Sequence, residues 1–382
     1  QFVSLFTSRN GLCIGRTVMS NIVISGYYGF GNAGDEAMLC AIIDAIRDVE
    51  DDAHITVISG NPQETSRKHN IKAVGTFAAF GILNAIRNAD LVISGGGSLL
   101  QDATSIRNTY YYLSIMGLAK LLGKPVMLYS QGIGPLYRKS TKRAVKFMLK
   151  YVDGITVRDS ISKDELNALG IYDVEVTADA VLAMHKANPS IGANILTKYN
   201  CAPIESGRKR IGIAVRSWKD DTAYRQSLAD VLSRLSLEQD AEIVFIPMSH
   251  PDDTKEAKII ASLMKIKPIV LEGPFTTEEQ LSLSGNVDLM IGIRLHALVF
   301  SSLMGKPVIG ISYDPKITSF LHMIEQEPIG TMTELDSNVL YDRCVELLQS
   351  TESYQHSFNR IQTLRKVSKR NAEFAISLLE EY

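Results

Sequence analysis

Arginine and histidine stand two residues apart in Arg294-Leu295-His296, just after an apolar run that begins at Asp288. An Arg guanidinium binds carboxylates and phosphates through paired hydrogen bonds, and a His can donate or accept a proton near neutral pH. A His in this context is often only a helix-start residue, but the flanking Arg at a strand end favours a functional role. The pair therefore predicts an anion site with His296 as general acid, its pKa held up by a bound dianion.

Two further cations follow apolar runs in the same half of the chain. Arg216 follows the run 211–215, and Lys316 follows the run that begins at Ile311. Ligands of open α/β sheets bind beyond the carboxyl ends of the strands, where these side chains are expected to meet Arg294. We therefore predict that Arg216, Arg294 and Lys316 bind a small ligand with two anionic groups.

The corresponding position in the first half carries three adjacent glycines, Gly95, Gly96 and Gly97. Each weakens a strand end or helix start by about 0.5–1 kcal/mol relative to Ala, which suggests that a ligand or another backbone comes close. The polar and aromatic residues that follow suit a sugar better than a phosphate. They are Gln101, Asp102, Arg107 and Asn108, with Tyr110, Tyr111 and Tyr112.

A glycine-rich turn at 29–34 leads into a predicted helix that starts at Asp35 or Glu36. Its GxGxxG spacing is typical of dinucleotide loops, but the next strand ends in Ser59-Gly60-Asn61 without an acidic residue, so NAD is not expected. The two carboxylates either complement the helix dipole or hold and deprotonate a sugar hydroxyl. Asp35, Glu36 and Asp102 are left as alternative general bases.

Four landmarks recur in the same order in both halves of the chain. The runs 21–26, 55–62, 90–93 and 122–126 correspond to 210–215, 243–248, 288–291 and 304–308. The offset between the halves varies, which indicates shared architecture rather than a clean tandem repeat. The predicted fold class is α/β, with two Rossmann-like parallel-sheet domains facing a cleft.

A length of 382 residues suits two domains of ordinary size. We expect domains at 19–190 and 210–350, joined by a linker at 191–209. Residues 351–382 are expected to form a C-terminal helix that returns to the first domain. Residues 1–18 lack a signal-peptide pattern and are expected to be a disordered extension foreign to the fold.

Composition excludes several classes of protein. A formal net charge of -2 argues against a nucleic-acid binder. The basic cluster 138–143 is interpreted as a solvated helix face, with an anionic surface as the alternative. The four cysteines form no CxxC pair, so no metal site and a reducing, cytoplasmic location are predicted. No apolar run reaches the ~20 residues needed to span a bilayer.

From Asn21 to about Leu348, the sequence resembles the polysaccharide pyruvyl transferase family. Six motifs carry the resemblance: Gly29-Phe30-Gly31-Asn32-Ala33-Gly34-Asp35-Glu36, Ser94-Gly95-Gly96-Gly97, Gln131-Gly132-Ile133-Gly134-Pro135, Val157-Arg158-Asp159, Ala178-Asp179 and Arg294-Leu295-His296. It looks closest to the cell-surface branch that acts on secondary cell-wall polymer in Gram-positive bacteria with surface-layer proteins.

The resemblance implies a glycosyltransferase-B-like fold and transfer of pyruvate from phosphoenolpyruvate, a co-substrate, to a sugar as a cyclic ketal. No cofactor is implied. The acceptor would be similar to a terminal β-linked N-acetylmannosamine, joined at O4 and O6, on a lipid-diphosphate-linked precursor at the inner membrane face. The family's catalytic His and Arg fall on His296 and Arg294, and its phosphate-binding Arg on Arg216. Asn32 and Gln131, in the matched motifs, join the predicted substrate-binding residues.

Two other functions fit parts of the pattern. A glycosyltransferase of the same fold would place the diphosphate of a nucleotide sugar in the second crevice and an acceptor in the first. A non-catalytic carbohydrate-binding protein would keep the glycine-rich loops but would not need the Arg and His pair. The sequence also leaves open the acceptor sugar, the need for its lipid and the formation of a homo-oligomer.

Overall fold

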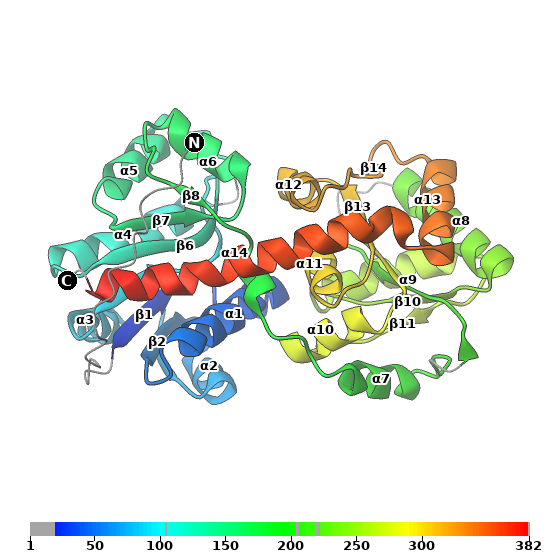
Figure 1. The fold of residues 1–382 in the computed structure, drawn as a ribbon, viewed down its shortest axis with the longest axis horizontal. Coiled ribbons are helices and arrows are strands. Elements are labelled where there is room, and N and C mark those ends of the chain that lie inside the picture. Colours follow the sequence, from blue (N-terminus) through cyan, green and yellow to red (C-terminus); the bar gives the residue numbers. More distant parts are fainter. Residues whose placement is uncertain (1–19, 104, 204–205, 218–221, 381–382) are drawn as a thin grey trace.

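The computed structural model describes residues 20–103, 105–203, 206–217 and 222–380, which form two parallel sheets flanked by helices (Figure 1). The predicted extension 1–18 lies outside the described residues. The first sheet has the strand order β3-β2-β1-β4-β6-β7-β8, and the second has β11-β10-β9-β12-β13-β14. The paired landmarks of the two halves occupy matching positions in the two sheets. The predicted α/β architecture with two Rossmann-like domains is therefore confirmed.

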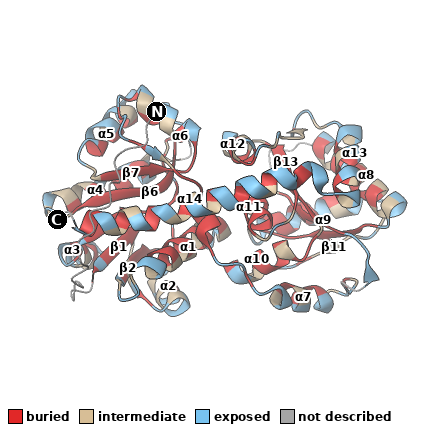
Figure 2. Cartoon of the chain, in the orientation of Figure 1, coloured by how far each residue is buried: buried red, intermediate tan, exposed pale blue. Residues whose placement is uncertain are grey.

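Helices cover the sheets, and most strand residues are buried (Figure 2). The strand sequences are accordingly almost continuously apolar. The first sheet contains β1 (Asn21–Ser25), β2 (His54–Ser59), β3 (Lys72–Gly75), β4 (Leu91–Ser94), β5 (Gly97–Leu100), β6 (Val126–Ile133), β7 (Gly154–Val157) and β8 (Glu175–Val176). The second contains β9 (Arg210–Ala214), β10 (Glu242–Phe245), β11 (Ile269–Val270), β12 (Leu289–Gly292), β13 (Val308–Ser312) and β14 (Gly330–Thr331).

Helices follow the strands in nearly strict alternation. The first half has α1 (Ala33–Val49), α2 (Pro62–His69), α3 (Ala79–Arg87), α4 (Ile106–Leu121), α5 (Lys139–Leu149), α6 (Ser160–Ala168) and the 3-10 turn η1 (Ala180–Ala183). Next come α7 (Pro189–Lys198), α8 (Thr222–Gln239), α9 (Asp252–Leu263), α10 (Thr277–Gly285), α11 (Leu295–Leu303), α12 (Pro315–Met323), α13 (Ser337–Gln349), η3 (Glu352–Tyr354) and α14 (Gln355–Glu380). Within the described ranges, no helix combines the length and apolarity needed to cross a membrane.

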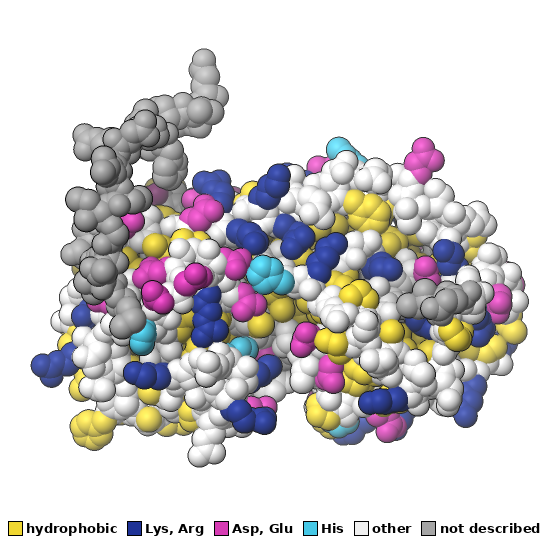
Figure 3. Space-filling view, turned by 60° about the horizontal axis from the view of Figure 1, so that its bottom comes forward, with side chains coloured by type: hydrophobic (Ala, Val, Ile, Leu, Met, Phe, Trp, Pro, Cys, Tyr) yellow, Lys and Arg dark blue, Asp and Glu magenta, His cyan; other side chains and the backbone are white. Residues whose placement is uncertain are grey.

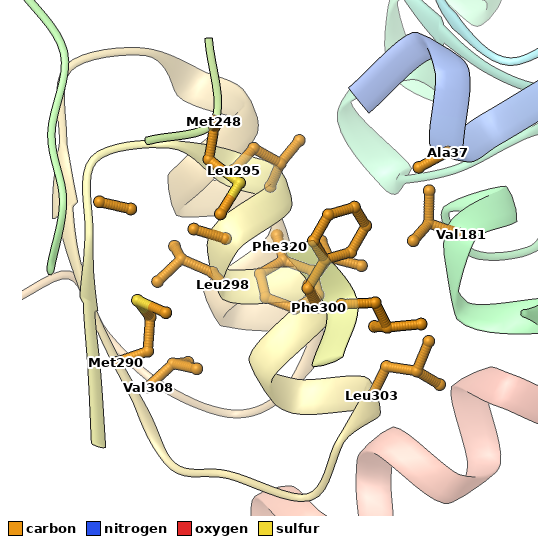
Figure 4. Close-up of a cluster of buried hydrophobic side chains, with 14 of the residues drawn as sticks. Ala37, Val181, Met248, Met290, Leu295, Leu298, Phe300, Leu303, Val308 and Phe320 are labelled. Atoms are coloured by element: carbon orange, nitrogen blue, oxygen red, sulfur yellow. The ribbon is translucent and has the colours of Figure 1, made fainter. Parts of the chain in front are cut away.

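The two faces of the first sheet belong to different hydrophobic clusters. On one face, Val23 and Val92 pack with residues of α3, α4 and α5. On the other face, the cluster continues from α1 through η1 into the second domain. Figure 4 shows Ala37 of α1 and Val181 of η1 beside the side chains of α11, including Phe300. This apolar contact joins the two domains next to their cleft.

The segment predicted as a linker, 191–209, is partly wrong because it begins inside α7. The Asn188 side chain accepts a hydrogen bond from the Ser190 N–H, and Pro189 occupies the first turn, so the expected loop signals start a helix instead. α7 packs against α10, where the Gly192 N–H donates to the Ser282 Oγ at 2.7 Å. This part of the segment is therefore a component of the second domain.

The C-terminal helix α14 extends across both domains (Figure 1). It contacts α1, η1 and strands of the first sheet. Polar groups fix the contact: the Thr177 hydroxyl donates to the Asn371 Oδ1 at 3.1 Å, and the Ser368 hydroxyl donates to the Asp179 carbonyl at 3.0 Å. α14 is thus a second covalent connection between the domains, on the side of α1.

The triple glycine is explained largely by the protein's own side chains. A Cβ on Gly95 would lie 2.1 Å from the Tyr28 hydroxyl oxygen, and one on Gly96 would lie 2.9 Å from the Met38 sulfur. Only Gly97, with φ +99°, has the left-handed backbone that favours glycine. The expectation that a ligand or another backbone comes close is corrected for Gly95 and Gly96, since side chains of α1 and its preceding loop pack against them.

Replacing Gly95 with Ala is expected to lower the free energy of unfolding by about 1–3 kcal/mol, because the fully buried Tyr28 ring has to move. Gly75→Ala is the matched control: its Cβ would meet only the Ala78 Cβ, at 3.6 Å. Denaturant unfolding followed by circular dichroism measures both. Equal stability of the two variants would contradict this packing explanation.

Candidate active site

A cavity of about 670 Å³ lies between the two domains, beyond the carboxyl ends of the central strands. The first domain contributes the glycine-rich loop, the start of α1 and the segment after β4, and the second contributes the ends of β9, β10, β12 and β13. Eight of the predicted site residues line it: Asn32, Asp35, Gly97, Gln101, Arg216, Arg294, His296 and Lys316.

The other predicted residues lie outside this lining: Glu36, Gly95, Gly96, Asp102, Arg107 and Gln131. Glu36 holds the glycine-rich loop, because its Oε1 accepts from the Gly29 N–H at 2.7 Å. Gln131 is fully buried and donates to the Ser94 hydroxyl and the Gly95 carbonyl. Arg107 is an exposed residue in the first turn of α4. A direct role in substrate binding is therefore not supported for these side chains.

Asp102 has a structural role at the start of α5. Its two oxygens accept hydrogen bonds from the backbone N–H groups of Tyr137, at 2.7 Å, and Arg138, at 2.9 Å. Burial opposes ionisation of this carboxyl, but the two N–H groups prevail and lower its pKa below the ordinary value. A carboxylate held in this way is a poor proton acceptor.

Arg294 is fixed by a partner that the sequence analysis missed. Its Nε donates to the Asp253 Oδ2 at 3.0 Å and its Nη2 pairs with the Asp253 Oδ1. The Asp253 side chain is fully buried, and its Oδ2 also accepts from the N–H groups of Met248 and Ser249. The bidentate partner of Arg294 is thus part of the protein, and no motif near Asp253 indicated it. This pairing orients the guanidinium that lines the cleft.

Arg216 and Lys316 lie beside one aromatic ring. The Arg216 Nη1 donates to the Tyr313 hydroxyl, and its guanidinium carbon lies 4.5 Å from the centre of the Tyr313 ring. The Lys316 Nζ is 6.0 Å from the same centre and 3.4 Å from the Asp314 Oδ2. Lys316 stands in the first turn of α12, where Asp314 is the N-cap. The predicted convergence of Arg216, Arg294 and Lys316 on one cavity is therefore present.

His296 lies in the first turn of α11 and faces the first domain across the cleft. A Cβ on Gly34, in α1, would lie 2.0 Å from the His296 Nδ1, so only glycine allows this approach. Its Nε2 is buried and has no hydrogen-bond partner among the described residues. Burial lowers the pKa of His296 to about 4, against the pull of Asp179, and the positive charges of Arg158 and Lys316 act in the same direction as burial. The imidazole of the unliganded protein is therefore neutral at neutral pH.

Arg158 is a fourth cation of the cleft that the predicted site residues did not include. Its side chain is buried, its Nη2 donates to the Ser98 hydroxyl at 3.1 Å, and its Nη1 lies 3.6 Å from the Asp179 Oδ2. Both Arg158 and Asp179 belong to motifs of the matched sequence pattern. The position of Arg158 directly after β7 is the signal that could have placed it in the cleft.

Asp35 is the carboxylate that faces this group of cations. Burial and, to a smaller extent, the charge of the neighbouring Glu36 raise its pKa to about 7, while Lys316 and Arg158 oppose the shift. Its Oδ1 would lie 3.1 Å from a Cβ on Gly97. A carboxyl that titrates near neutral pH in a cleft is suited to accept a proton.

The first-domain wall of the cleft also carries aromatic and neutral polar groups. The rings of Tyr27 and Phe30 stack with their centres 4.5 Å apart, and both remain partly exposed. Asn108 and Tyr112 line the same wall, whereas Tyr110 and Tyr111 do not. Such a surface suits the hydroxyl groups and apolar faces of a sugar. Within the described part of the chain, no group of three or more His, Cys, Asp or Glu is placed to hold a metal ion.

Solved structures similar to this chain share its fold at low sequence identity. The MnaA–UDP complex of S. aureus matches with a TM-score of 0.62 and 14% identity, covering 89% of this chain and 91% of that one. UDP-GlcNAc 2-epimerase from Neisseria meningitidis, bound to UDP-GlcNAc, matches with a TM-score of 0.62 and 12% identity, covering 94% and 100%. These likenesses establish a glycosyltransferase-B-type arrangement of the two domains.

Sequence comparison identifies the family to which the chain belongs. The amylovoran biosynthesis protein AmsJ of Erwinia amylovora is 24% identical, over 77% of this chain and 84% of its own length. Residues 32–315 match the family described as polysaccharide pyruvyl transferase, a range that contains most lining residues of both cleft walls and the three lining arginines. The chain therefore belongs to the polysaccharide pyruvyl transferase family, whose activity is the transfer of pyruvate to polysaccharide.

Proposed function

We propose that this protein transfers pyruvate from phosphoenolpyruvate to a terminal sugar as a cyclic ketal and releases phosphate. The observation that carries the proposal is the convergence of Arg216, Arg294 and Lys316 around His296, opposite Asp35. Phosphoenolpyruvate bears a phosphate and a carboxylate on one small carbon frame, which matches a compact group of cations. The proposed reaction needs neither a metal ion nor a cofactor, and the absence of a cofactor stays a prediction.

The pKa of His296 suggests how the donor recruits its own general acid. The neighbouring cations and burial keep the imidazole neutral in the free protein. A bound phosphoenolpyruvate would offset the positive charge of Arg158, Lys316 and Arg294 and so raise the pKa of His296. Protonation of His296 would then accompany donor binding, which limits the acid to the complex in which it is needed.

The proposed reaction proceeds in balanced steps. His296 gives its proton to the methylene carbon of phosphoenolpyruvate, which leaves a positively charged, electrophilic C2, while the arginines hold the carboxylate and phosphate of the donor. One sugar hydroxyl attacks C2 and transfers its proton to Asp35. The bond from C2 to the phosphate oxygen then breaks, and the second hydroxyl attacks C2, closes the ketal and gives its proton to the departing phosphate. The proton held by Asp35 returns to His296 through solvent before the next turnover. Asp35 is favoured over Glu36 and Asp102 as the base because it alone lines the cleft.

The acceptor side of the proposal depends on the family resemblance. We propose a terminal β-N-acetylmannosamine, modified at O4 and O6, on a lipid-diphosphate-linked precursor of secondary cell-wall polymer. The protein would meet this acceptor at the inner face of the cytoplasmic membrane. Tyr27, Phe30 and Asn108 supply a sugar-compatible wall on that side of the cleft. The remaining alternative is a nucleotide-sugar glycosyltransferase, since the same fold occurs in proteins solved with UDP.

Incubation with phosphoenolpyruvate and a synthetic N-acetylmannosamine acceptor tests the reaction directly. We expect phosphate release and a pyruvyl mass gain of the acceptor in equal amounts, and calorimetric binding of phosphoenolpyruvate without any nucleotide.

Arg294→Lys should raise the KM for phosphoenolpyruvate at least about tenfold, because Lys lacks the planar fork that Asp253 orients. Arg87→Lys, at the exposed end of α3, is the control. Binding of a uridine nucleotide in place of phosphoenolpyruvate would favour the glycosyltransferase.

Replacing His296 with Ala is expected to reduce kcat by about a hundredfold or more, the usual contribution of a general acid. Loss of an imidazole from the cleft should leave the melting temperature close to that of the wild type. His322→Ala removes an exposed imidazole paired with Glu327 and should leave kcat unchanged. A folded His296→Ala protein with near-normal kcat would exclude His296 as the acid.

The pH dependence of the reaction should report Asp35. Its carboxylate form is the base, and its pKa is raised to about 7, so kcat at saturating phosphoenolpyruvate, where His296 carries its proton, is expected to rise with pH through about 7. Asp35→Asn should lower kcat by about 10²–10⁴ and abolish this rise, whereas the exposed control Asp52→Asn should preserve the wild-type profile. A rise that persists in Asp35→Asn would arise from the donor phosphate and would remove Asp35 from the mechanism.

A further inference from the structure

One helical layer of the first domain has a charge unlike that of the rest of the chain. This basic layer consists of α3, α4, α5 and their flanking loops, residues 76–151, and covers the sheet face opposite α1. The segment has ten Lys and Arg residues and two Asp residues, in a chain with a net charge of -2. The ten are Arg87, Arg107, Lys120, Lys124, Arg138, Lys139, Lys142, Arg143, Lys146 and Lys150.

The two acidic residues of the segment do not neutralise this surface. Asp102 is buried and accepts from backbone N–H groups at the start of α5, and Asp90 accepts from the Asn21 N–H at 2.8 Å. Among the residues that the structure describes, Lys120 is the single member of the ten that forms an ion pair, with Asp153. On the face shown in Figure 3, by contrast, Lys and Arg are interspersed with Asp and Glu.

Large apolar side chains stand exposed among these cations. Phe77 and Phe80 are 91% and 90% exposed. Phe147 of α5 and Tyr151, just after α5, form an exposed ring pair with their centres 5.3 Å apart. The basic layer contains eight of the seventeen exposed large hydrophobic side chains in the described residues, in about a fifth of the chain. These eight are Phe77, Phe80, Leu83, Tyr110, Leu121, Tyr137, Phe147 and Tyr151.

The combination of cations with exposed aromatic side chains distinguishes a membrane-binding surface from a helix face that is only solvated. A solvated basic face gains nothing from exposed Phe side chains, which cost free energy in water. Anionic headgroups attract Lys and Arg, while aromatic rings favour the boundary between headgroups and acyl chains. We propose that the basic layer binds the surface of a bilayer that contains anionic phospholipid, with Phe77 and Phe80 inserted at the interface.

The basic layer is connected directly to the wall of the cleft. Asp102 ties the start of α5 to the segment that carries Gln101, a lining residue of the cleft. Tyr111 of α4 donates to the Thr76 carbonyl at 3.0 Å, which fixes the loop that carries Phe77. Membrane binding would therefore hold the first-domain wall near the lipid surface. The binding itself follows from the surface alone, and its value for a lipid-linked acceptor depends on the proposed function.

Co-sedimentation with vesicles tests the inference on the full chain. We expect binding to phosphatidylcholine vesicles that contain phosphatidylglycerol, little binding to phosphatidylcholine alone, and weakening with added salt. The triple variant Lys139→Gln, Arg143→Gln, Lys146→Gln should lower the partition coefficient about a hundredfold, roughly fivefold for each charge. The matched control Lys198→Gln, Lys265→Gln, Lys267→Gln removes three exposed charges of the second domain and should retain binding.

A second variant separates a bilayer from a soluble polyanion. Phe77→Ser, Phe80→Ser leaves every charge in place and should also weaken vesicle binding several-fold. Full binding by this variant, or equal losses in the two triple variants, would overturn the inference. Phosphate release with a water-soluble acceptor should be the same in the wild type and in Lys139→Gln, Arg143→Gln, Lys146→Gln. Vesicle binding by a protein that transfers no pyruvate would leave the inference standing while the proposed function fails.

Discussion

The close approach of Gly34 to His296 is the contact on which the cleft depends. Gly34 belongs to the first turn of α1 and His296 to the first turn of α11, so two helix starts from different domains meet without an intervening side chain. The apolar contact of α1 and η1 with α11 lies directly behind this point, and α14 crosses the same side. The imidazole is consequently half-buried at the wall of the cleft, and this burial lowers its pKa.

Charge in the cleft is arranged so that fixed carboxylates orient the cations. Asp253 holds Arg294 through two hydrogen bonds and is itself held by two backbone N–H groups. Asp179 stands 3.6 Å from Arg158, and Asp314 stands 3.4 Å from Lys316. Cations held in this way lose little side-chain entropy when an anion binds, because their positions are set before the ligand arrives. Asp35 differs from these carboxylates, since its raised pKa keeps it able to exchange a proton near neutral pH.

The cleft wall and the outer helical layer of the first domain differ in the types of side chain that they expose. Its cleft wall combines aromatic rings, amides and one titrating carboxyl, while its outer helical layer combines cations with exposed aromatic rings. The two surfaces share the segment around Asp102, which anchors α5 and continues into the cleft wall. A sugar site that lies next to a proposed membrane-binding face would suit a polymer acceptor with a lipid at one end.

Sequence periodicity and strand-end positions determined the architecture and the donor side of the cleft. The recurring landmarks predicted two matching sheets, and the rule that ligands bind at carboxyl strand ends selected Arg216, Arg294, His296 and Lys316, because both depend on local order along the chain. Tertiary structure alone decided what each polar residue faces. It paired Arg294 with the distant Asp253, assigned Gly95 to Tyr28, directed Glu36 and Asp102 toward backbone N–H groups and left Asp35 in the cleft. These outcomes depend on contacts between segments far apart in sequence, for which residue type and spacing carry no signal.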